Sequence, residues 1–114
     1  MNTSKPNENG VLEEGRREIV ARHGRACAVV NIARCEDGRY RHGMEMWYSH
    51  GGFSSPISAH SEGFATIGEA RRAGLEDLLR QWHEAWPSEP KSVHDELRVM
   101  REQIEAQLCQ PSLF

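Results

Sequence analysis

The Asp37-Gly38 pair, flanked on both sides by strand-like runs, is the feature that most limits how this chain can fold. Residues 26–35 contain a short apolar run, and residues 40–50 are rich in methionine and aromatic side chains. Because Asp and Gly both tolerate positive φ angles, this arrangement predicts a β-hairpin closed by a tight turn. An antiparallel sheet is therefore expected at the centre of the fold.

A two-residue turn at Asp37-Gly38 would also set the register of the hairpin. Cys35 would pair with Tyr40, and a slip of one residue would exchange the two faces of a strand. The expected core face comprises Cys27, Val29, Ala33, Cys35, Tyr40, Met44, Met46 and Tyr48. The expected outer face carries Ala28, Val30, Ile32, Trp47, Arg34, Arg41 and Glu45.

A long amphipathic helix is predicted over residues 66–86. Thr66 and Glu69 fit a capping box at its start, in which each side chain bonds the backbone of the other residue. Apolar residues then recur at helical spacing as far as Trp86, and Pro87 ends the helix.

A second helix is predicted over residues 92–108, with Ser92 as its N-cap. Its apolar residues form a single narrow stripe, which is too little to keep an isolated helix stable. The stripe must dock on the sheet, on the first helix or on a second copy of the chain, in which case it forms the oligomerisation surface. It consists of Val93, Leu97, Met100, Ile104 and Leu108.

The N-terminal part of the chain leaves an alternative open. Residues 1–10 are polar and are expected to form a disordered lead. Residues 11–22 favour a short helix with Gly24 at its C-terminal end, but a strand over residues 17–22 also fits.

Residues 51–63 are rich in Gly, Ser and His and predict a long loop. A short third strand over residues 53–58 also fits, and Pro56 would confine it to a sheet edge. The expected fold is thus α+β: an antiparallel sheet of two or three strands packed by one long helix, with an additional C-terminal helix. One domain would span residues 11–110, followed by a short tail at residues 111–114.

Composition narrows the functional classes. The chain has 114 residues and a net charge of −3, without a basic tract of the kind that holds a nucleic-acid backbone. The cysteines are odd in number, and the residues after Met1 do not form an apolar signal segment. These features predict a cytoplasmic protein with free thiols and without a membrane span.

Catalytic and metal-binding motifs are not evident. The sequence neighbours Ser49-His50 and His60-Ser61 would point apart on a strand, and the histidines lack the spacing of a structural zinc site. We therefore predict neither catalytic residues, nor a metal, nor a cofactor. The enzymatic alternative is a small metal hydrolase built on His42, His50 and His60.

The candidate binding residues are arginines at the hairpin tip and the tryptophans. Arginine binds phosphate and carboxylate groups bidentately, and tryptophan is enriched at binding hot spots. Neighbouring glutamates could instead neutralise the arginines, and the tryptophans could belong to the core. Exposure of the tryptophans on the helix would decide between an anchor and a core role. The candidates are Arg34, Arg39, Arg41, Trp47, Trp82 and Trp86.

The run Trp-Tyr-Ser-His-Gly-Gly-Phe-Ser-Ser-Pro-Ile-Ser at residues 47–58, followed by Phe64-Ala65-Thr66, resembles small strand–strand–helix modules of phage- and plasmid-borne accessory proteins. The similarity extends over about half of the chain, and the helix at residues 92–108 departs from it. The resemblance implies a non-enzymatic protein of a mobile genetic element that occludes a surface of a host protein or nucleoprotein complex, as anti-CRISPR inhibitors do.

The alternative in a different functional class is a small nucleic-acid-binding module. In that case the hairpin would contact bases through Trp47 and phosphates through Arg41. A strong dependence of binding on salt would identify it.

Overall fold

The computed structural model describes residues 11–12 and 16–110, so the expected N-terminal lead at 1–10 and tail at 111–114 lie outside the described residues. The elements in chain order are β1 (Val11–Leu12), β2 (Arg16–His23), β3 (Ala26–Arg34), β4 (Tyr40–Tyr48), β5 (Gly51–Ser55), β6 (Ile57–Ser58), α1 (Ile67–Gln81) and α2 (Lys91–Leu108).

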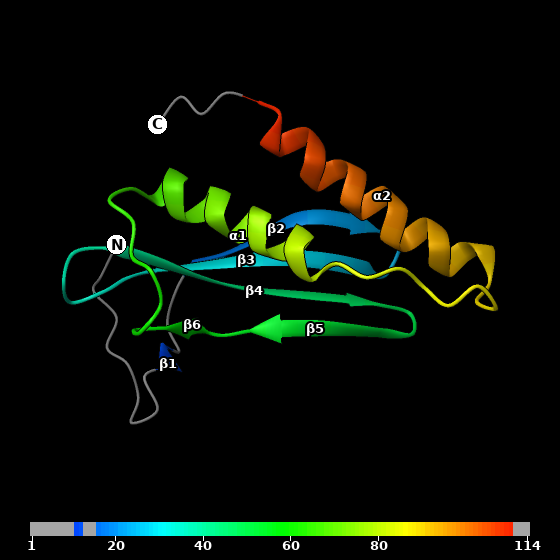
Figure 1. Ribbon diagram of the computed structural model, residues 1–114, viewed down its shortest axis with the longest axis horizontal. Coiled ribbons are helices and arrows are strands. Elements are labelled where there is room, and N and C mark those ends of the chain that lie inside the picture. The colour runs from blue at the N-terminus through cyan, green and yellow to red at the C-terminus, as the bar shows by residue number, and fades with distance from the viewer. Residues whose placement is uncertain (1–10, 13–15, 111–114) are drawn as a thin grey trace.

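The centre of the molecule is a four-stranded antiparallel sheet in the order β2-β3-β4-β5. Both helices lie on the same face of this sheet, as Figure 1 shows. The short strands β1 and β6 pair with each other as a separate two-stranded sheet. The expected α+β class is confirmed, with four strands in the main sheet instead of two or three. No helix in the described part of the chain is long and apolar enough to cross a membrane.

The favoured helix over residues 11–22 is wrong, and the alternative of a strand is correct. Residues 16–23 form β2, which pairs with β3 through a turn where Gly24 adopts a φ of 60°. A bulge between Ile19 and Ala21 shifts the register. As a result, the consecutive residues Val20 and Ala21 are both buried, which hides the period of two that identifies a strand.

The hairpin between β3 and β4 exists as predicted, but its loop contains three residues instead of two. The Cys35 amide donates to the Arg39 carbonyl at 2.8 Å, and the Gly38 amide donates to the Cys35 carbonyl at 2.9 Å. Gly38 has a φ of 82°, the left-handed conformation that closes such a loop.

The extra loop residue shifts the expected register by one position. Met44 pairs with Val30 and not with Asn31, so the predicted face of β4 is correct while the two faces of β3 are exchanged. Ala28, Val30 and Ile32 therefore join Met44 and Met46 in the core under the helices. Cys27 and Val29 lie on the opposite face.

Helix α1 covers β3 and β4, whereas α2 lies mainly against β2. Thr66 caps α1 as predicted, because its hydroxyl accepts the Glu69 amide at 3.1 Å. The helix ends at Gln81, five residues before the predicted end at Trp86, because the chain turns into an extended conformation at Trp82.

Helix α2 begins one residue earlier than predicted, at Lys91. Pro90 occupies the cap position and Ser92 is already helical, so the expected Ser92 cap is wrong. The apolar stripe docks on the chain's own sheet, which places its side chains in the core and not on a surface open to a second copy. The fully or almost fully buried members are Val93, Leu97, Met100 and Ile104, and Leu108 is partly buried against the same core.

Two glutamines of α2 bond the outer edge of β2. Gln103 accepts the Arg22 amide at 2.8 Å and donates to the Arg22 carbonyl at 3.1 Å. Gln107 donates to the Val20 carbonyl at 2.6 Å. The two side chains thus form hydrogen bonds with backbone amide and carbonyl groups of β2. An edge strand without such bonds would offer these groups to a further strand.

Candidate functional site

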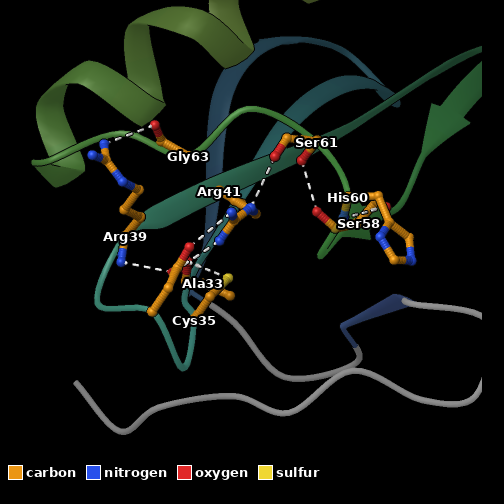
Figure 2. Close-up of polar contacts among 9 residues, drawn as sticks. Ala33, Cys35, Arg39, Arg41, Ser58, His60, Ser61 and Gly63 are labelled. Carbon is orange, nitrogen blue, oxygen red and sulfur yellow. Dashed lines mark hydrogen bonds and ion pairs between the residues drawn. The ribbon is translucent and has the colours of Figure 1, made fainter.

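The hairpin tip is closed by an internal ion pair (Figure 2). The Arg41 guanidinium donates to both carboxylate oxygens of Asp37, at 3.0 and 2.9 Å, and its Nε donates to the Ser61 carbonyl at 2.9 Å. These hydrogen bonds lower the pKa of Asp37 to about 2 and raise the pKa of Arg41. Only 12% of the Arg41 side chain is exposed, so Arg41 holds the tip together and does not face a ligand.

The other arginines of the tip divide between internal bonding and solvent. The Arg39 amide donates to the Asp37 carboxylate at 3.0 Å, and its side chain donates to the Gly63 carbonyl at 3.4 Å (Figure 2). Arg34 is exposed at the end of β3. The tip therefore does not gather the three arginines into one free cationic cluster, because the loop at residues 58–63 uses two of them.

A second surface lies on the sheet face opposite the helices. Ile19 and Trp47 are 46% and 40% exposed there, although both are large apolar residues. Arg17 joins them: its guanidinium lies 5.6 Å from the centroid of the Trp47 ring and donates to Glu45 at 2.7 Å. We call Arg17, Ile19, Glu45 and Trp47 the open-face patch.

The open-face patch contains only one of the predicted site residues, Trp47. Arg17 and Ile19 were missed because residues 11–22 were interpreted as a helix, in which these side chains have no relation to the hairpin. In β2, side chains alternate between the two faces of the sheet. Arg17 pairs with Asn31 and Ile19 pairs with Val29, which places Arg17 and Ile19 on the face opposite the helices.

The structure separates Trp82 from Trp86. Trp82 is partly buried against the core and meets the Phe53 ring edge-on, with centroids 6.3 Å apart. Trp86 is 77% exposed in the segment between the helices. Trp82 is therefore a core residue, and Trp86 is the exposed one of this pair.

The three histidines proposed for a hydrolase do not converge. His42 Nε2 and the Asp77 carboxylate are 2.7 Å apart, which connects β4 to α1, whereas His50 pairs with Glu89 near the other end of β4. That strand separates them by about 20 Å. His60 lies in the turn after β6, where its amide donates to Ser58. No group of three or more potential ligands that could hold a metal ion occurs among the described residues.

The His42–Asp77 pair borders a cavity of about 490 Å³ between α1 and the segment after β6. A catalytic dyad presents the second ring nitrogen to a substrate. Here His42 Nδ1 is buried and has no hydrogen-bond partner among the described residues. The pair therefore links sheet and helix, and its remaining nitrogen is not accessible from the cavity.

These features define a small α+β protein with a four-stranded antiparallel sheet, two helices on one face and an exposed patch on the other. Neither a family model, nor a curated protein, nor a solved structure matches the chain.

Proposed function

We propose that this chain is a non-enzymatic binding protein that uses the open-face patch to occupy a surface of a protein partner. The observation that carries the proposal is the exposed Trp47 ring with the Arg17 guanidinium held over it. Trp and Arg are the residue types most enriched at energetic hot spots of interfaces.

The patch is supported on rigid elements. Trp47 and Glu45 lie on β4 and Arg17 lies on β2, so the Arg17–Glu45 ion pair spans the central strand β3. A contact surface that is already ordered loses less conformational entropy on binding than a loop does. The arrangement therefore suits a partner that docks against the sheet.

The charges favour a protein partner over a nucleic acid. Arg17 is ion-paired with Glu45, and Arg41 is bonded to Asp37, so a phosphate backbone would have to displace a carboxylate from each arginine. The net charge of −3 adds repulsion at long range. A protein surface can instead combine an apolar contact to Trp47 and Ile19 with an acidic or polar group near Arg17.

The resemblance to phage- and plasmid-borne accessory proteins supplies the class of partner. We propose a host protein or nucleoprotein complex whose function is blocked when the open-face patch covers part of its surface, in the manner of an anti-CRISPR inhibitor. The buried second nitrogen of His42 argues against a catalytic use of the His42–Asp77 pair.

The test is affinity capture from host lysate, identification of the captured protein, and titration of that purified protein by calorimetry. The Trp47→Ala variant should bind at least ~30-fold more weakly, because removing a hot-spot tryptophan costs about 2 kcal/mol or more. Trp86→Ala is the matched control and should bind like the wild type. Equal affinity of the Trp47→Ala variant, or binding only to nucleic acid with a steep salt dependence, would exclude the proposal.

A further inference from the structure

Trp86 is a large apolar side chain held at the surface by a defined turn. The Glu89 amide donates to the Trp86 carbonyl at 2.9 Å, and the Glu89 carboxylate pairs with His50 in the turn between β4 and β5. In the next helix, Glu96 accepts both the amide and the hydroxyl of Ser49, at 3.1 and 2.8 Å. These contacts anchor the segment around Trp86 to the sheet while 77% of the residue remains exposed.

A pocket of about 290 Å³ lies beside Trp86, between residues 82–85 and α2. This volume equals that of about ten water molecules at ~30 Å³ each, which is enough for one indole ring. Its lining combines apolar side chains with two arginines, two histidines and one carboxylate, that of Glu84. The lining includes Trp82, Ala85, His94, Leu97, Arg98 and Arg101.

The chemistry of the pocket suits an aromatic guest. Trp82 and Leu97 provide apolar surface, and the guanidinium groups of Arg98 and Arg101 can lie against the face of a ring. Hydrogen bonds to Glu102 and then Asp95 raise the pKa of Arg98, so this side chain stays charged. The exposed indole on the same chain is therefore complementary to the pocket next to it.

We propose that two copies of the chain associate symmetrically, with Trp86 of each copy inserted into this pocket of the other. The ring and the pocket are adjacent, since Ala85 lines the pocket and Trp86 follows it directly. Because Trp86 and the pocket are neighbours on one surface, two copies can face each other across a two-fold axis and make both insertions at once. Such an interface closes the assembly as a dimer. This interface differs from the apolar stripe of α2, which the chain's own core uses.

The expected interface is small. An aromatic side chain buries about 150–250 Å². Two tryptophans and the pocket walls that they cover therefore bury roughly 600–1,000 Å², which is below the standard size of a stable complex. The dimer should accordingly be weak, with a dissociation constant in the range of about 10 µM to 1 mM.

The test is sedimentation equilibrium of the full chain from about 5 µM to 1 mM. The average mass of the wild type should rise from 13.0 kDa towards twice that value, whereas Trp86→Ala should stay at the monomer mass. Arg101→Glu, at the exposed rim of the pocket, should weaken association by about fivefold or more through loss of the cation–π contact. Trp47→Ala is the matched control and should associate like the wild type, which separates this result from the proposed function.

Two outcomes would overturn the proposal: a wild-type mass of one chain at every concentration, or association of the Trp86→Ala variant like the wild type. Circular dichroism checks that each variant is folded. A second readout is tryptophan emission in the Trp47→Phe variant, which should shift to shorter wavelength as concentration rises. The emission of Trp86 alone is the difference between the Trp47→Phe variant and the Trp47→Phe/Trp86→Phe variant, because Trp82 is partly buried and emits in both. If that difference is already at short wavelength in the dilute monomer, Trp86 fills its own pocket, which would also contradict the proposal.

Discussion

Replacement of Gly74 by alanine in the middle of α1 produces two effects of opposite sign. Gly is less favourable than Ala in a helix interior by about 1 kcal/mol, so propensity alone predicts a more stable protein. However, a Cβ atom at this position would lie 2.7 Å from Cγ1 and 3.1 Å from Cγ2 of Val30. Both distances are shorter than ordinary van der Waals contacts between carbon atoms.

The close contact with Val30 should decide whether Gly74→Ala raises or lowers the free energy of unfolding. Val30 is fully buried on the central strand, and its β-branched side chain has few rotamers to choose from. An added methyl group in such a packed core costs about 1–3 kcal/mol. After subtraction of the helix-propensity gain, Gly74→Ala should destabilise the protein by about 1 kcal/mol, which lowers the midpoint of thermal unfolding by about 4 °C.

The assay is reversible unfolding in urea, with two comparison variants. Ala73→Gly changes helix propensity at the neighbouring position and should cost about 1 kcal/mol. In a Val30→Ala background the two clashing methyl groups are absent, so Gly74→Ala should become neutral or stabilising. If Gly74→Ala stabilises the otherwise unchanged protein by about 1 kcal/mol, the inference that α1 and β3 are in close contact is wrong.

Two further predictions concern the hairpin tip and the edge of the sheet. The pKa of Asp37 lies at about 2 in the folded chain and at its ordinary 3.8 when unfolded, so its contribution to stability is complete above about pH 4 and is lost as the pH falls towards 2. Acid titration followed by circular dichroism should therefore show a larger loss of stability over this interval for the wild type than for Asp37→Asn. Gln103→Ala leaves the outward amide and carbonyl of Arg22 without their partner and should lower the free energy of unfolding in urea by about 1–2 kcal/mol; an unchanged midpoint would contradict this role.

The sequence was sufficient to predict the elements that are encoded by local signals. The Asp37-Gly38 turn and the Thr66 cap both depend on residues within one turn of each other, and both are present. The register was not predictable in the same way, because Asp-Gly serves both two-residue and three-residue loops. One additional loop residue was enough to move Val30 from the outer face to the core.

The remaining errors have their cause in tertiary contacts. Helix α1 ends before its pattern does because Trp82 leaves the helix and packs edge-on against Phe53, a contact between distant parts of the chain. Only Trp47 of the open-face patch was predictable from the sequence. Arg17 and Glu45 are 28 residues apart, and they meet only because β2 and β4 lie on either side of β3. The bulge in β2 interrupts the alternation of buried and exposed residues by which a strand is predicted, so β2 was not predicted with preference over a helix.

The ion pair between Arg17 and Glu45 also crosses strand β3 on the face opposite the helices. Val29 pairs with Ile19 on one side and with Glu45 on the other, and it has no exposed surface. Opening an exposed bridge of this kind costs about 1 kcal/mol or less. A partner that brings its own carboxylate could therefore replace Glu45 as the ion-pair partner of Arg17 at little cost in free energy.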